Sequence, residues 1–311
     1  MLPFVLAFTP TFSWNLVSDW QQIFRFSFMQ YAFEAGTIIA IVAGVVGFFV
    51  VLRNLSFAGH ALSHSGFAGA TAAVVLGIGS LYGLLIFSLG GALIMGFLGK
   101  RLRGRDIAVG IVLAWTLGLG VFFLSLYAGY ANEAYAILFG EILGISQSNV
   151  QTALVVGIIT LVAVALIFRP LLFTSLDEEI AEARGIPTRL ISMLFMIILA
   201  LAVAGASMVV GVLLIFALLV TPAAIAERLS TRPPIVLLLS VVLSVIFTWV
   251  GLLIAYYFPY PVSFFITSLA FVTYLMVRFV PFAWTLLLAI TNRKEDVEAD
   301  RAGSVLTELR L

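Results

Sequence analysis

Residues 33–52 read FEAGTIIAIVAGVVGFFVVL, an apolar run of 20 residues whose one charged side chain, Glu34, stands near its start. A helix of about 20 apolar residues crosses the hydrocarbon core of a bilayer, because every backbone polar group there must be bonded within its own helix. This stretch therefore predicts a transmembrane helix.

Eight further apolar runs follow, each bounded by charge or by Gly and Pro; they lie near 57–78, 80–99, 107–128, 150–168, 189–204, 207–226, 234–257 and 262–280. We expect nine transmembrane helices. Eight is the fallback, because only Gly205, Ala206 and Ser207 separate two of the runs, and a kinked helix would look similar. The 311 residues are 63% hydrophobic and 10% charged, which leaves no room for a sizeable soluble domain. The predicted fold class is all-α, a polytopic integral membrane protein.

Three regions are expected along the chain. Residues 1–30 form an N-terminal segment along the membrane interface, residues 31–281 the transmembrane domain, and residues 282–311 a cytoplasmic tail. With nine spans, nearly all cations fall on one side, which is the cytoplasmic side because Lys and Arg stay there. They are Arg53, Lys100, Arg101, Arg103, Arg105, Arg169, Arg184, Arg189, Arg228, Arg232, Arg278 and the C-terminal basics, with Arg25 alone on the other side.

Several functional classes are disfavoured by composition and motifs. The chain has no cysteine, so any metal must be held by nitrogen or oxygen. Its net charge is +1 and no basic tract alternates with aromatics, so no nucleic-acid partner is expected. No nucleophile elbow is present, and Ile94 stands where a phosphate-binding loop ending near Lys100 needs its first glycine. The chain is not expected to be an enzyme, and any ATP hydrolysis must come from a separate subunit.

His60 and His64 are the only histidines, and they lie four residues apart inside an apolar run. That spacing puts both on one helical face, where two neutral imidazoles can chelate a transition-metal ion. An ionisable side chain inside the membrane is costly, which makes a functional role the default hypothesis. The alternative is that each imidazole is bonded to a carbonyl or hydroxyl of a neighbouring helix. The sequence His-Ala-Leu-Ser-His also lacks the general-base Glu of a zinc protease.

Two connections are longer than a turn. On the cytoplasmic side, residues 177–187 read DEEIAEARGIP: acids fill the first turn, and Gly185 followed by Pro187 ends a short surface helix. An ordinary amphipathic linker is the alternative. On the outer side, residues 129–149 could form a short re-entrant segment containing Glu133 and Glu141.

Together these segments resemble the permease subunit family of bacterial ABC importers for manganese, zinc and iron, from about Phe28 to Arg278. The most specific matches, in the family's order, are VVLRNLSFAGHALSH at 50–64, LFGEIL at 138–143, the segment from Asp177 through Ala181 to Gly185, and VGVLL at 210–214 continuing to PAA at 222–224.

The resemblance implies a multi-pass protein of the bacterial plasma membrane that works with a second copy of itself. Its other partners would be cytoplasmic ABC ATPase subunits and an extracytoplasmic metal-binding protein. Asp177, Ala181 and Gly185 would belong to the coupling helix that docks on the ATPase. His60 and His64 would meet the transported metal, and no permanent cofactor is implied.

One position departs from the family pattern, which usually has Asp where this chain has His60. A second imidazole in place of a carboxylate favours zinc over manganese or iron. Two other classes stay open. An ion-coupled secondary transporter would place charges at the membrane midplane, often with an inverted repeat, and no convincing repeat is found. An intramembrane metalloenzyme would need a positioned acid or base beside the histidines.

Overall fold

The computed structural model describes residues 22–101, 105–126, 138, 140, 142, 144–258 and 260–279. Within these residues every regular element is a helix, as the composition predicted. The helices are α2 (Ser27–Leu52), α3 (Ser56–Leu76), α4 (Ser80–Arg101), α5 (Arg105–Ser125), α7 (Gln147–Leu176), α8 (Glu178–Ala183), α9 (Thr188–Val210), α10 (Val212–Leu229), α11 (Pro233–Tyr257) and a further helix, Val262–Phe279.

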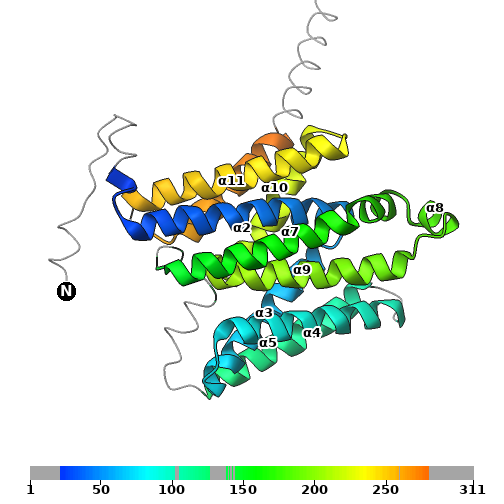
Figure 1. Cartoon of the computed structure of the whole chain (residues 1–311), viewed down its shortest axis with the longest axis horizontal. Helices are drawn as coiled ribbons and strands as arrows, with labels where there is room; N and C mark the ends of the chain where they lie inside the picture. Colours follow the sequence, from blue (N-terminus) through cyan, green and yellow to red (C-terminus); the bar gives the residue numbers. More distant parts are fainter. Residues whose placement is uncertain are drawn as a thin grey trace, which may run out of the picture.

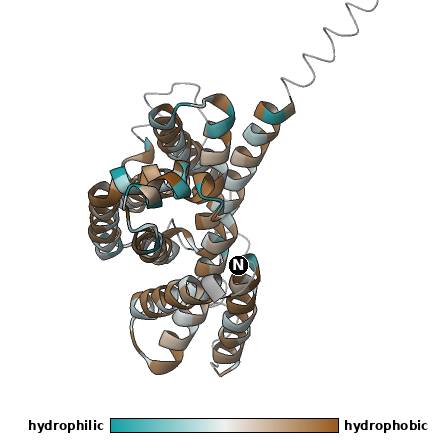
Figure 2. Cartoon of the chain, turned by 90° about the vertical axis from the view of Figure 1, so that its right-hand side faces the viewer, coloured by the Kyte–Doolittle hydropathy of each residue, from teal (hydrophilic) through white to brown (hydrophobic). Residues whose placement is uncertain are grey.

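Eight of the described helices are long and apolar enough to cross a membrane. α3 is long enough, with 21 residues, but it is not among these eight because two histidines and many small residues lower its hydropathy. Counting α3, the described part contains the nine long helices that the sequence predicted. Hydrophobic residues dominate these helices, and hydrophilic ones are confined to short segments (Figure 2).

The boundary between α9 and α10 differs from the prediction. The sequence placed the break at residues 205–207, whereas the chain leaves the helix at Gly211, whose φ is +81°. Gly205 lies inside α9, where a Cβ would overlap the side chain of Val156 in α7. The glycine at 205 therefore serves close helix packing, and the one at 211 supplies the backbone conformation that ends the helix.

Two other helices extend beyond their apolar runs. α2 begins at Ser27, within the segment expected to lie at the interface, and the Phe24 ring packs 5.2 Å from that of Phe33. α7 continues through Pro170 to Leu176, although the sequence placed its end near Arg169. The expected positions of residues 1–21 and 280–311, and of Glu133, Phe139 and Glu141 in the re-entrant segment, lie outside the described residues.

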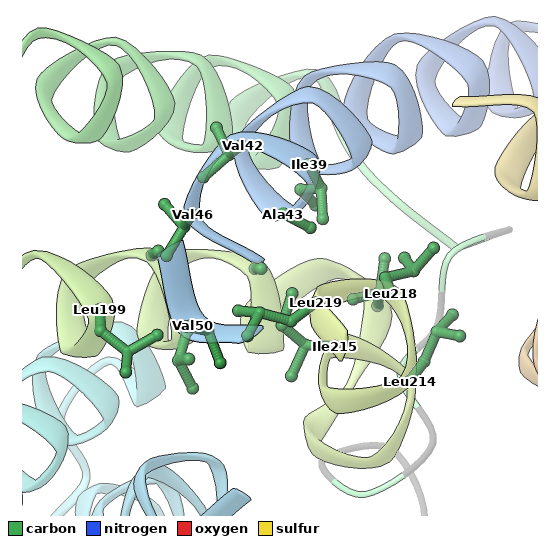
Figure 3. Packing of buried hydrophobic residues seen from close by; sticks show 14 of the residues in the cluster. Ile39, Val42, Ala43, Val46, Val50, Leu199, Leu214, Ile215, Leu218 and Leu219 are labelled. Carbon is green, nitrogen blue, oxygen red and sulfur yellow. The ribbon is translucent and has the colours of Figure 1, made fainter. Parts of the chain in front are cut away.

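The core is built around α2, which packs against α7, α9, α10 and α11 (Figure 1). Figure 3 shows Val46 and Val50 of α2 beside Leu219 of α10 and Leu199 of α9. Gly47 allows this approach, since a Cβ there would overlap the backbone of Leu219. Small residues let membrane helices associate closely where no difference in hydrophobicity drives them together.

Candidate metal site and cytoplasmic helix

α3 carries the two histidines and is fixed by its neighbours on one side. Gly69 of α3 and Gly83 of α4 lie so close that a Cβ on either would overlap the backbone of the other. Two turns earlier, the carbonyl of Leu62 accepts a hydrogen bond from the Ser88 hydroxyl at 3.4 Å. Residues two apart on a helix point about 200° away from each other. His60 and His64 therefore lie on the face of α3 turned away from α4.

The two imidazoles lie against each other on that face. Their ring centroids are 4.6 Å apart at an interplanar angle of 81°. The ring of Phe216 in α10 lies 4.8 Å from that of His60. Nδ1 of each histidine is buried and has no hydrogen-bond partner among the described residues. These two nitrogens lack the hydrogen bonds that a purely structural role would supply.

The arrangement can offer a metal ion two neutral nitrogens and a ring that excludes water from one side. In the part of the chain that the structure describes, no three His, Cys, Asp or Glu side chains are placed so that they could hold a metal ion together. Protein metal shells usually hold at least four ligands, so the remaining ones must be water, backbone oxygen or another molecule. An incomplete shell suits an ion that is passed on, because a closed cage releases its metal slowly.

The cytoplasmic helix predicted over 177–187 is present as α8, which projects beyond the ends of α7 and α9 (Figure 1). The Asp177 carboxylate caps it by accepting the Ile180 N–H at 2.9 Å. Gly185 ends it with a φ of +77°, and the Ile186 N–H returns to the Ala181 carbonyl at 3.1 Å. Both ends are thus defined by the residues that the sequence singled out.

Ala181 is fully buried within its own chain, whereas Ile180 is 49% exposed. The resemblance placed Ala181 in the helix that docks on the ATPase, but its side chain is buried within its own chain. The exposed residues of α8 are Ile180, Ala183 and the acidic residues Glu178, Glu179 and Glu182. Asp177, Ala181 and Gly185 shape the helix, and its exposed residues are the ones available to a partner.

Several connections that the sequence placed on the cytoplasmic side meet at one end of the bundle. A pocket of about 290 Å³ is lined by Arg53 from the α2–α3 link, Ala58 of α3, Glu178 of α8, and residues from α4, α5 and α9. These elements meet at the end of the bundle that the distribution of Lys and Arg predicted to be the cytoplasmic one. The ends of α2, α4, α7 and α9 therefore lie together next to the base of the histidine-bearing helix.

Two residues of this region were not predicted from the sequence. Phe216 beside His60 has no distinguishing local signal, because it is one aromatic in an apolar run. Arg53 bonds hydroxyl groups on α7 and α9, at sequence separations of 121 to 139 residues. Its position directly after an apolar helix marks it as a membrane-end cation, but only the fold brings its partners to it.

Long apolar helices packed through glycines, with a pair of imidazoles inside one of them, define a polytopic membrane protein of the transport class. The family model described as the ABC 3 transport family matches residues 25–281. The chain belongs to this family, which consists of the membrane-spanning permease subunits of ABC transporters and not of enzymes.

Curated relatives carry manganese in their names. The manganese transport system membrane protein MntC of Halalkalibacterium halodurans is 32% identical over 239 residues, covering 76% of this chain and 82% of the relative. The manganese import system permease protein ScaB of Streptococcus gordonii is 34% identical, covering 76% and 86%.

A solved structure, PsaBC from Streptococcus pneumoniae in complex with Fab, aligns with a TM-score of 0.76 at 31% identity. It covers 84% of this chain and 95% of that one. The sequence had placed zinc ahead of manganese. The names of the relatives support manganese and give zinc no support.

Proposed function

We propose that the chain is the permease subunit of an ATP-driven importer of divalent transition-metal cations, with manganese as its cargo. The observation that carries the proposal is the His60–His64 pair, two adjacent imidazoles with unpartnered Nδ1 atoms on a helix inside the membrane. Family membership supplies the transport class, and the named relatives supply the preference for manganese over zinc and iron.

The proposed assembly contains two copies of this chain, cytoplasmic ABC ATPase subunits and an extracytoplasmic metal-binding protein, in a bacterial plasma membrane. α8 docks on the ATPase through its exposed Ile180 and acids. ATP binding and release move α8 and the ends of α7 and α9. That movement reorients α3 and opens the histidine face to each side of the membrane in turn, with the C-terminal tail staying in the cytoplasm.

The histidines act on the ion during its passage. A divalent cation entering hydrocarbon must exchange some of its water for protein ligands, and each imidazole nitrogen replaces one. The Phe216 ring beside His60 limits the space for water on that side. With no further ionisable ligand in the described residues, binding stays weak enough for release.

Zinc is the second candidate cargo, because a specific feature favours it. Two imidazoles without a carboxylate form a more nitrogen-rich site than the His and Asp pair usual in the family. Nitrogen ligands rank zinc above manganese, while carboxylates suit manganese well. Affinity rank seldom decides selectivity by itself, and the relatives' names therefore weigh more in placing manganese first.

The deciding experiment is uptake into vesicles that contain the chain with its ATPase and binding protein, measured for Mn²⁺, Zn²⁺ and Fe²⁺ with and without ATP. We expect ATP-dependent uptake with Mn²⁺ preferred. Uptake by the lone chain driven by an ion gradient would instead establish a secondary transporter. His60→Asp, which restores the usual family pair, should keep uptake and increase the preference for Mn²⁺ over Zn²⁺.

A further inference from the structure

Arg53 lies at the junction between the cytoplasmic helix and the histidine-bearing helix. It follows the last residue of α2, and only Asn54 and Leu55 separate it from α3. The link is tightly built: Asn54 has a φ of +54°, and the Leu55 N–H donates to the Val50 carbonyl at 2.7 Å. Because Leu55 is also 2% exposed, a displacement of Arg53 carries the start of α3 with it.

The guanidinium of Arg53 reaches both ends of the segment that holds α8. Nη1 donates to the Thr174 hydroxyl at 3.1 Å and lies 3.4 Å from the Ser175 hydroxyl, both in the last turn of α7. Nη2 donates to the Ser192 hydroxyl near the start of α9 at 2.6 Å. The planar guanidinium of arginine can donate hydrogen bonds to two partners in fixed directions at once, which the single ammonium group of lysine cannot.

α8 is joined rigidly to these two anchor points. Asp177 caps α8 directly after α7, and the Thr188 hydroxyl at the start of α9 donates to the Glu182 carboxylate at 2.6 Å. A displacement of α8 therefore moves Thr174 and Ser192 as well, because the connections on both sides of α8 are short and hydrogen-bonded. Beside this junction, the pocket of about 290 Å³ between Ala58 and Glu178 leaves room for movement.

We propose that Arg53 is the positioning residue that transmits the movement of α8 to α3, and so to His60 and His64. The proposal rests on the proposed function, since it presupposes that α8 is moved by an ATPase. Arg53 touches neither metal nor nucleotide in this scheme. It converts a displacement at the ends of α7 and α9 into a displacement of the α2–α3 link, which lies one turn before His60.

A brace that only stabilises the fold would behave differently from a transmitting residue. Loss of a brace lowers the amount of folded complex and reduces uptake and ATP hydrolysis together. Loss of the transmitting contact leaves the ATPase working and separates hydrolysis from transport. The quantity that distinguishes the two roles is the number of Mn²⁺ ions taken up for each ATP hydrolysed.

The test compares Arg53→Ala, Arg53→Lys and Ser192→Ala in vesicles containing the whole complex. Ser192→Ala keeps the arginine and its bonds to α7, so it is expected to fold even if Arg53→Ala does not. We expect Mn²⁺ uptake per ATP to fall roughly five-fold or more in Arg53→Ala, the lower end of typical coupling between sites, and less in the other two. ATP hydrolysis should persist in all three.

Arg228→Ala is the control, because Arg228 on α10 also lies over an aromatic ring, with its guanidinium carbon 5.6 Å from the ring centroid of Tyr274, as that of Arg53 lies 5.9 Å from Phe195; unlike the half-buried Arg53, it is exposed. The number of Mn²⁺ ions that this control takes up per ATP hydrolysed should equal that of the wild type. If the number of Mn²⁺ ions taken up per ATP hydrolysed is unchanged in both Arg53→Ala and Ser192→Ala, the inference is overturned. If Arg53→Ala does not assemble, an unchanged number in Ser192→Ala overturns it alone. If the wild-type complex shows no ATP-dependent uptake, the proposed function itself has failed.

Discussion

At the scale of single residues, the proposed metal role rests on His60 and His64. Each has a buried Nδ1 without a hydrogen-bond partner in the described part of the chain. Leaving a polar atom buried and unpaired costs about 1–3 kcal/mol. Two such atoms one helical turn apart are retained at a cost in stability, which a contact made during transport explains.

Replacing both histidines by alanine should abolish Mn²⁺ uptake while leaving the complex assembled. The variant removes both ring nitrogens, and a loss of about 1.4 kcal/mol in stabilising the passing ion already slows transport roughly ten-fold. It also removes two unpaired polar atoms from α3, so the thermal unfolding temperature should stay the same or rise. Vesicle uptake and thermal unfolding in detergent measure the two effects.

Alanine at Ser63 is the control, because its hydroxyl lies on the same helix and bonds only the Gly59 carbonyl among the described residues, at 3.1 Å. Normal Mn²⁺ and Zn²⁺ uptake by the double alanine variant would contradict the metal role and return the histidines to a structural one.

Among the elements, the short helix α8 ends at a glycine whose backbone conformation other residues rarely adopt. Gly185 has a φ of +77°, and a Cβ there would meet nothing within 4 Å. A side chain at this position is therefore opposed by backbone strain of about 1–2 kcal/mol and not by lack of space. The strain would unwind the end of α8 or change the direction in which α9 leaves it.

Gly185→Leu should weaken docking of the ATPase and reduce ATP hydrolysis stimulated by metal. Gly77→Leu is the matched control: Gly77 ends α3 with a φ of +67° and likewise has nothing within 4 Å of a built Cβ, but it lies at the other end of its helix from the α2–α3 link. Co-purification and ATPase assays compare the two. Equal effects from both variants would show that α8 has no special part in coupling.

A second prediction at the level of elements concerns the contact between α3 and α4. A methyl group on Gly69 would overlap the backbone of Gly83, so Gly69→Ala should force the helices apart and destabilise the protein by about 1–3 kcal/mol. Gly90→Ala on α4 adds the same methyl group where nothing lies within 4 Å. Its unfolding temperature should match the wild type. Similar unfolding temperatures for the two variants would contradict the packing shown here.

The elements also show where sequence reasoning succeeds and where it fails. Long apolar runs and the distribution of Arg and Lys predict nine helices, because the bilayer imposes those patterns on the chain directly. The break between α9 and α10 was misplaced, since Gly205 and Gly211 look alike in sequence. The structure distinguishes them: Gly205 packs against Val156, whereas Gly211 has the positive φ that ends the helix.

At the scale of the molecule, the proposed metal site has few ligands within one chain. The described residues supply two imidazoles and no third acidic, histidine or cysteine ligand beside them. The pairing of His60 with His64 could be predicted from their spacing, whereas Phe216 and the partners of Arg53 come from distant helices that only the fold brings near.

The purified complex should contain two copies of this chain. The measurement is the mass of the detergent-solubilised complex after subtraction of bound detergent. The proposed assembly pairs two copies, and the described residues of one chain place only two imidazoles together, so a second copy would bring further ligands to the path. A complex with one copy would require all metal ligands to come from a single chain, and would contradict the proposed pairing.

The low hydropathy of α3 has a consequence for how the protein is made. Every other long helix described here has the length and apolar composition of a membrane-crossing helix, while α3 has the length but a lower hydropathy. Its histidines and small residues leave it poorly recognised as a membrane segment when it emerges from the ribosome. α4 follows after a three-residue turn and offers the glycine surface on which α3 packs. We therefore expect the two helices to enter the membrane as a hairpin, and a chain truncated between them to leave the histidine helix outside the bilayer.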